Sequence, residues 1–167
     1  MATSHAGHDR PARAGHYVKL AWMVALMFVA MYVLMYAMVD RFGNVFNSLN
    51  QFYMAALMTG AMVLIELLVM GGMYPDKRLN AAILAISAIV TVASWFGIRE
   101  QTAIGDDQFL RSMIPHHAGA ILMCEEAPLE DARIRQLCRE IVQSQQEEIR
   151  TMKMLLAGEE TPSPRNR

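Results

Sequence analysis

The sequence predicts an all-α membrane protein in which three transmembrane helices are followed by a water-exposed antiparallel helical hairpin. Three observations predict this class. Three apolar blocks are long enough to cross a bilayer, since about 20 helical residues span its core of about 30 Å. Charged residues collect between these blocks, where water can solvate them. After the third block, apolar residues continue at the spacing of an amphipathic helix.

The composition agrees with this class and excludes others. Apolar residues make up 54% of the 167-residue chain, above the roughly 45–50% of soluble domains. The formal net charge is −1, so nothing indicates a nucleic-acid partner. The two cysteines are too few for a disulfide framework, whereas methionine is frequent, with 15 copies.

We expect a flexible N-terminal tail over residues 1–19 and a three-helix transmembrane domain over residues 20–98. The three blocks cover residues 20–39, 52–74 and 81–98. The first is longer than the apolar core of a secretory signal, about 7–15 residues, so we interpret it as a retained anchor. Short connections predict neighbouring helices that run up, down and up. Small residues in the third block predict close helix packing: Ala81, Ala85, Ser87, Ala88, Ala93 and Ser94.

Flanking Lys and Arg residues predict the orientation. One side carries Arg10, Arg13, Lys19, Lys77 and Arg78, and the other carries Arg41, Arg99 and Arg111. This bias of five to three favours a cytoplasmic N-terminus. Three crossings then place the C-terminal hairpin in the periplasm, for a chain in the bacterial inner membrane.

Methionines recur every four residues in the first two blocks, as Met23, Met27, Met31 and Met35, and then as Met54, Met58 and Met62. One interpretation is a ladder of thioether ligands for Cu(I), with Met58, Met62 and the intramembrane Glu66 forming a site. The alternative is an inclined packing ridge, because a four-residue step drifts about 40° around the helix axis. Glu66 would then be a protonated carboxyl bonded to a neighbouring helix.

Residues 106–157 are predicted to form the hairpin, and residues 158–167 a disordered tail. Asp106 or Asp107 can cap the first helix, Pro115 lies inside it, and residues 127–129 form the turn. Gly158 suits the end of the second helix. Two helices of this size are too few to bury a core alone. We therefore expect half of a ferritin-like four-helix bundle completed by homodimerisation, with packing on the membrane helices as the alternative.

The hairpin concentrates soft and borderline metal ligands. They are Met113, His116, His117 and Met123 on the first helix, and Gln145, Glu148 and Met152 on the second. A turn centred near residue 128 puts Met113 level with Gln145. Imidazole with thioether favours copper, whereas imidazole with carboxylate would also accept zinc or iron. Adjacent His side chains diverge by about 100°, so only one of the two points fully inward.

The same antiparallel pairing places Cys138 nearer to residue 119 than to Cys124. An intrachain disulfide between Cys124 and Cys138 therefore looks strained, and we interpret both as core residues.

Two segments of the hairpin resemble the signatures of the domain-of-unknown-function 305 family. They are residues 107–123, DQFLRSMIPHHAGAILM, and residues 145–152, QQEEIRTM. Soluble relatives arrange two such hairpins as a ferritin-like bundle, and some are periplasmic copper binders. The membrane portion is similar to the Met-rich anchor of a membrane-bound branch. The resemblance implies copper, as Cu(I) or Cu(II), at the seven residues named above, and implies no catalytic activity.

We therefore expect a membrane-anchored copper-binding protein that acts in copper tolerance, storage or delivery, together with a copper-handling partner protein. One alternative is a Met-lined oligomeric Cu(I) transporter. Another is a structural or assembly subunit of a larger membrane complex. An enzyme is not expected, because the sequence offers no nucleophile–base set, no phosphate-binding loop and no pair of Glu-x-x-His helices.

Overall fold

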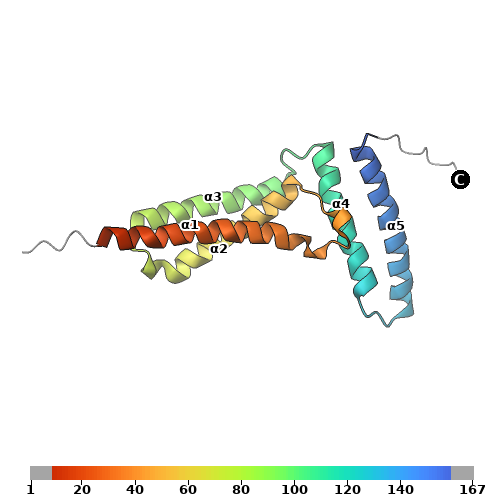
Figure 1. The fold of residues 1–167 in the computed structure, drawn as a ribbon, viewed down its shortest axis with the longest axis horizontal. Helices are drawn as coiled ribbons and strands as arrows, with labels where there is room; N and C mark the ends of the chain where they lie inside the picture. The colour runs from red at the N-terminus through yellow and green to blue at the C-terminus, as the bar shows by residue number, and fades with distance from the viewer. Residues whose placement is uncertain (1–8, 159–167) are drawn as a thin grey trace, which may run out of the picture. The chain divides into compact units, whose positions relative to one another are not determined.

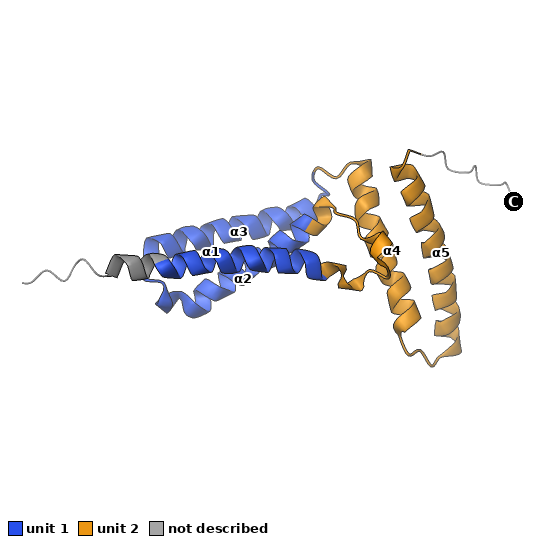
Figure 2. Cartoon of the chain, viewed as in Figure 1, with its two compact units in different colours: residues 1–34, 52–102 blue, residues 35–51, 103–167 orange. Residues whose placement is uncertain are grey.

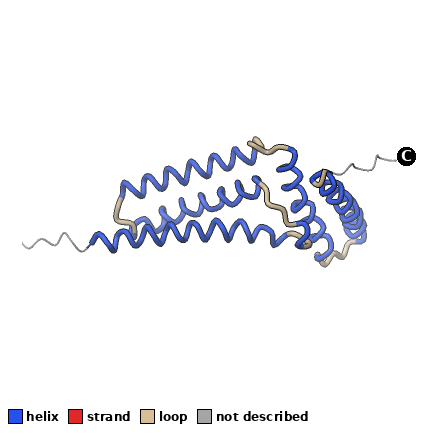
Figure 3. Tube along the Cα trace, turned by 45° about the horizontal axis from the view of Figure 1, so that its top comes forward, coloured by secondary structure: helices blue, strands red, loops and turns tan. Residues whose placement is uncertain are grey.

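The computed structural model describes residues 9–158, and the expected disordered tail at residues 158–167 lies outside them except for Gly158. Five α-helices occur in this part of the chain: α1 (Asp9–Leu34), α2 (Leu49–Met70), α3 (Lys77–Arg99), α4 (Asp106–Glu126) and α5 (Ala132–Leu156). Three short 3₁₀ helices lie in the connections: η1 (Met35–Met38), η2 (Phe42–Asn44) and η3 (Gly71–Met73). No strand is found in residues 9–158 (Figure 3), so the predicted all-α class is confirmed.

The chain divides into two compact units (Figure 2). The membrane unit contains residues 1–34 and 52–102, and the hairpin unit contains residues 35–51 and 103–167. The connection between α1 and α2, assigned from the sequence to the transmembrane domain, belongs with the hairpin.

The membrane unit contains the three predicted spans. Gly15–Met38, Leu49–Met73 and Lys77–Arg99 are each long and apolar enough to cross a membrane. Helix α1 begins at Asp9, so residues 9–19 are helical and not a flexible tail. Pro11 does not prevent this, because the first turn of a helix has no backbone N–H groups that need an intrahelical acceptor.

The three helices of the membrane unit lie alongside one another (Figure 1). One cluster of buried apolar residues joins them, to which α1 contributes Leu20, α2 contributes Val63 and Leu67, and the following connection contributes Tyr74. The Tyr17 hydroxyl donates to Asn80 Oδ1 at 2.8 Å and ties α1 to α3. The unit is therefore stabilised by apolar packing and by polar contacts near one end of the helices.

Small residues bring α2 close to α3, as the composition of the third block predicts. Ser87, Ser94 and Gly97 are the buried residues of α3. A Cβ atom on Gly60 of α2 would collide with Thr91 Oγ1 and lie 3.2 Å from the Ser87 carbonyl oxygen. Thr91 is held in place because its hydroxyl donates to that same carbonyl at 2.8 Å.

Replacing Gly60 by Leu is therefore expected to separate α2 from α3 and to lower the stability of the membrane unit. Forcing a side chain into such a contact costs about 1–3 kcal/mol. Thermal unfolding in detergent would measure the change. Gly15→Leu in α1 is the matched control, since a Cβ there meets no atom within 4 Å. Equal melting temperatures for the two variants would contradict the close approach.

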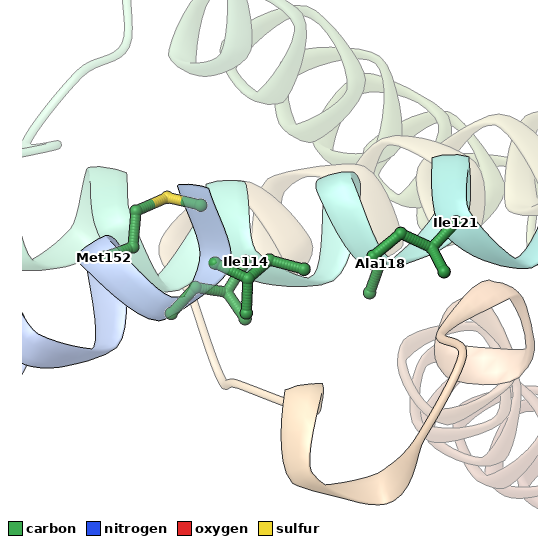
Figure 4. Packing of buried hydrophobic residues seen from close by; sticks show 5 residues of the cluster. Ile114, Ala118, Ile121 and Met152 are labelled. Atoms are coloured by element: carbon green, nitrogen blue, oxygen red, sulfur yellow. The ribbon is translucent and has the colours of Figure 1, made fainter. Parts of the chain in front are cut away.

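The hairpin unit is built on the antiparallel pair α4 and α5. Its core contains Ile114, Ala118 and Ile121 from α4, with Ile149 and Met152 from α5 (Figure 4). Val39 and Phe46, from the connection between α1 and α2, pack against this core. A third segment of the same chain thus covers part of the core that α4 and α5 form.

Lys153 fastens α5 to this third segment. Its Nζ atom donates to the Gly43 carbonyl at 2.9 Å and to Asn44 Oδ1 at 2.6 Å. The same ammonium lies 5.9 Å from the centre of the Phe46 ring, within cation–π range. On α4, a Cβ on Gly119 would lie only 3.3 Å from the Met38 carbonyl oxygen, so glycine permits the close approach of η1.

The capping residues of α4 and α5 agree with the sequence prediction except at the start of α4. Asp131 caps α5 by accepting from the Arg133 backbone N–H at 2.8 Å. Gly158, with φ +72°, occupies the left-handed position that ends α5, as predicted. At the start of α4, however, Gly105 takes the capping position, and both aspartates lie inside the first turn. Their carboxylates still favour the helix there, through its dipole.

Candidate metal centre

A pocket of about 310 Å³ opens between α4 and α5 in the hairpin unit. Its lining combines aromatic, thioether, imidazole, hydroxyl and carboxylate side chains: Phe109, Met113, His117, Glu147, Glu148, Thr151 and Met152. Four of the seven ligands predicted from the sequence are among them. The pocket is therefore the place where the predicted chemistry converges.

His117 and Glu148 face each other across this pocket. His117 Nδ1 lies 3.0 Å from Glu148 Oε2, with the His117 side chain 13% exposed and the Glu148 side chain 48% exposed. The other carboxylate oxygen, Oε1, accepts a hydrogen bond of 2.8 Å from the Ser144 hydroxyl. Ser144 lies one turn before Glu148 on α5, so it orients the carboxylate toward α4.

The contact between His117 and Glu148 is close but is not an aligned hydrogen bond. His117 Nδ1 is one of two buried side-chain nitrogen or oxygen atoms without a hydrogen-bond partner among the described residues. Burial lowers the pKa of His117 below its usual 6.5, and His116 lowers it further, while Glu148 acts in the opposite direction. The result favours a neutral imidazole with a nitrogen directed at a carboxylate.

Such an arrangement fits a shared cation. Two ligand atoms bound to one metal at 2.0–2.1 Å, at a right angle, are separated by about 3 Å. Within residues 9–158, no group of three or more His, Cys, Asp or Glu side chains could hold a metal. Further donors from the described part of the same chain must therefore be of other residue types. Met113 and Met152 line the same pocket, and their thioether sulfurs are such donors.

Comparison with known proteins places this hairpin in a family. The profile of the family described as Domain of unknown function (DUF305) matches residues 95–156. A relative from Acanthamoeba polyphaga mimivirus, described as Uncharacterized protein L153, is 34% identical over 141 residues. The alignment covers 80% of this chain and 91% of the relative. The chain belongs to the DUF305 family.

The DUF305 profile covers α4 and α5 and hence every residue that lines the pocket. The alignment with the viral relative is longer than the hairpin, and its 141 residues must include membrane helices as well. The relationship therefore extends to the membrane portion. No solved structure matches the chain.

Three of the predicted ligands in the DUF305 hairpin lie outside the pocket lining. His116 is exposed, and its ring centre lies 6.1 Å from that of His117. Met123 is 54% exposed near the far end of α4. Gln145 is half-buried on α5. The expectation that only one of the two adjacent His residues points inward agrees with this geometry, and the inward residue is His117.

The helix register explains which residues meet. The sequence argument centred the turn near residue 128, but α4 ends at Glu126 and α5 begins only at Ala132. The midpoint between the paired Cys124 and Cys138 is residue 131. Met113 is therefore level with about residue 149 and not with Gln145, which brings Glu148 and Met152 to the site.

Sequence reasoning missed several residues of the DUF305 pocket. Phe109 and Thr151 line it, and Ser144 bonds to the carboxylate of Glu148. Helical spacing contained part of this information. Phe109 precedes Met113 by four residues, and Ser144 precedes Glu148 by four, so each pair shares a helix face.

The same register corrects the expectation for the two cysteines. Cys124 and Cys138 form a disulfide, with their Cα atoms 5.2 Å apart, inside the usual range of 4.4–6.8 Å. The prediction of two unpaired core cysteines was wrong, because it used a turn centred too early. Both residues are only half-buried. The disulfide closes the hairpin near its turn.

Reducing this disulfide is expected to lower the stability of the hairpin by about 3 kcal/mol, the value for a closed loop of about 15 residues. Alkylation of the unfolded protein should label no cysteine before reduction and two after it, as counted by mass spectrometry. The Cys124→Ser/Cys138→Ser variant supplies the unlabelled control. Two labelled cysteines in the unreduced protein would contradict the pairing.

The candidate residues in the membrane unit are arranged differently. Glu66 accepts a hydrogen bond of 3.2 Å from the hydroxyl of Tyr74, which follows α2 in the chain. Met58 and Met62 are 38% and 40% exposed, so their row lies on an outer face of α2. The row on α1, from Met23 to Met35, is half-buried. The two methionine rows thus differ in their exposure.

Proposed function

We propose that this DUF305 protein is a membrane-anchored copper-binding protein that acts in copper tolerance, storage or delivery. His117, Glu148, Met113 and Met152 would hold the ion. The observation that carries the proposal is the buried His117 Nδ1, which lies 3.0 Å from a carboxylate oxygen without an aligned hydrogen bond. A cation between the two groups would satisfy both.

The donor set supports copper over other metals. Zinc and iron sites favour imidazole with carboxylate or thiolate, whereas thioether sulfur is a soft ligand that suits copper, and Cu(I) in particular. Neutral imidazole binds either oxidation state, and burial holds His117 in that form. Bound copper would carry one or two positive charges into the pocket, which the Glu148 carboxylate offsets.

The disulfide supports placing the hairpin outside the cytoplasm. Disulfides form and persist in oxidising compartments such as the periplasm, whereas cytosolic thiols are kept reduced. The excess of Lys and Arg on the N-terminal side favours the same orientation. We therefore propose a protein of the bacterial inner membrane, or its equivalent, with a cytoplasmic N-terminus and a periplasmic hairpin. Its partners would be a second copy of the chain and a copper-handling protein.

Metal content tests the proposal. The detergent-purified protein would be loaded with Cu(I) in ascorbate, washed, and assayed for bound copper by elemental analysis. About one copper per chain is expected. Glu148→Gln should weaken retention by at least about 100-fold, because loss of a ligand should exceed the 10- to 100-fold cost of losing a residue that supports one. Glu140→Gln, on the exposed surface of the same helix, should not. No copper on the wild-type protein would leave a structural subunit as the better explanation.

A second candidate function is transport of Cu(I) by an oligomer. It is favoured by the outer row of α2, where Met54, Met58 and Met62 are each about two-fifths exposed and could face another copy. Glu66 would then capture the ion at one end of the row. Copper that is lost from Glu66→Gln but kept by Glu148→Gln would favour transport over binding in the hairpin.

A further inference from the structure

One face of the hairpin carries two stripes of side chains that repeat every seven residues. On α4 the stripe is Phe109, His116 and Met123, all exposed. On α5 it is Ile134, Ile141, Glu148 and Leu155, of which Ile141 is half-buried and the other three are exposed. Phe109, Met123, Ile134 and Leu155 are all between 47% and 54% exposed. A seven-residue repeat keeps side chains on one side of a helix and is the seam along which helices pack in bundles.

Both stripes lie on the same face, because both border the metal pocket. Phe109 from the first stripe and Glu148 from the second line that pocket. The connection between α1 and α2 covers other parts of α4, where it reaches Gly119 and the core. The pocket therefore opens onto a face that these residues of the same unit leave exposed.

The face has the pattern of a surface that can pair with itself. Each stripe has apolar side chains at both ends and a polar group, His116 or Glu148, in its interior. A two-fold axis through the pocket would bring apolar ends onto apolar ends and polar groups onto polar groups. Two helices about 30 Å long present roughly 600 Å², which is the lower limit of the roughly 600–1,000 Å² that each partner contributes to a standard interface.

We propose that a second copy of this chain packs on this face, and that His116 of the partner subunit completes the copper site beside His117 and Glu148. The proposal rests on the copper site proposed above. It accounts for an exposed imidazole one residue from the site, whose ring is tilted 59° from that of His117. One chain cannot direct both adjacent imidazoles into its own pocket, whereas two facing chains can exchange them.

The mass of the full-length protein in detergent, measured by native mass spectrometry, tests the interface without any metal. The wild type is expected to be a dimer. Phe109→Glu/Ile134→Glu should be a monomer, since it places charges on the seam while changing only exposed residues. Phe42→Glu, at a residue 92% exposed outside the seam, should remain a dimer. A monomeric wild type, or a charged seam variant that still dimerises, would overturn the proposed interface.

Mixed dimers test the exchanged ligand. The His116→Ala and His117→Ala chains would be produced together with different tags and purified through both. If the partner supplies His116, one intact site forms in each mixed dimer, which should retain about half of the wild-type copper. Each single-variant dimer should retain little. Wild-type copper content in the His116→Ala dimer would overturn only the exchanged ligand, whereas a copper-free wild type would overturn the copper site as well.

Discussion

Replacing His117 by Ala is expected to abolish copper retention by the hairpin. His117 is the partly buried imidazole of the pocket, and its buried Nδ1 atom has no aligned hydrogen bond that could compete with a metal. At other metal sites, loss of a residue that merely supports a ligand costs about 10- to 100-fold in affinity. Loss of the ligand itself should exceed that range, so we expect a decrease of at least about 100-fold in competition with a Cu(I) chelator.

The matched control is His16→Ala, which removes an imidazole from the membrane unit and should leave the affinity unchanged. A second measurement, of secondary structure, distinguishes the loss of a ligand from unfolding of the variant. The far-ultraviolet circular dichroism of His117→Ala should equal that of the wild type, because its side chain borders a pocket and is not part of the apolar core. An affinity for Cu(I) that His117→Ala leaves within about twofold of the wild type would exclude this residue as a ligand.

Truncating Ile114 or Ile121 to Ala is expected to destabilise the hairpin by about 2–5 kcal/mol each. Both side chains are completely buried, at 0% exposure, and they occupy the centre of the hairpin core. Each truncation removes apolar surface from the core and leaves a cavity, because the two helices and the covering segment are held together by the disulfide and Lys153.

Hydrogen exchange measured by mass spectrometry can locate this loss. Amides of α4 and α5 should exchange at least about thirtyfold faster, since each 1.4 kcal/mol is a factor of ten. Amides of α2 and α3 belong to the other unit and should not change. Leu137→Ala is the control, because that side chain is already 54% exposed and lies outside the proposed seam. Similar exchange in the Ile114→Ala and Leu137→Ala proteins would argue against the core described here.

The membrane helices could be predicted because the bilayer imposes a simple rule on the sequence. Every backbone group inside lipid must bond within its own helix, so length and apolarity suffice to find the spans. The predicted blocks and the structural spans end at nearly the same residues. At their N-terminal ends the structural spans begin a few residues earlier than the predicted blocks. The end of α5 was also predictable, because Gly158 tolerates the left-handed backbone that the cap requires.

The register in which α4 pairs with α5 was harder to predict, because it depends on the number of residues in the turn. Pro128 marked the turn correctly, but Asp131 caps the next helix and shifts its start to Ala132. A displacement of three residues in the centre of the turn changes each pairing by about six residues. That one error moved Gln145 into the predicted site and separated Cys124 from Cys138.

The covering role of residues 35–51 could not be predicted from spacing. The segment has no helical or strand period, and its contacts to α4 and α5 join residues that are far apart in the sequence, such as Asn44 and Lys153. Helical spacing does separate the two histidines, because His117 shares a face with Leu110, Met113 and Ile121, whereas His116 does not. The direction of α4 relative to α5 decides which imidazole enters the pocket.

The contact between residues 35–51 and the hairpin has a consequence for biosynthesis. If all three spans cross the bilayer, this segment and the hairpin emerge on the same side, although residues 52–102 separate them in the chain. A chain whose third span failed to insert would leave Val39 and Phe46 across the lipid from Ile114 and Ile121. Its hairpin would lack its cover, and Lys153 would lack its acceptors. The hairpin core is therefore complete only in a chain whose three spans are all inserted. Quality-control proteases could distinguish misinserted chains by the uncovered core of their hairpin.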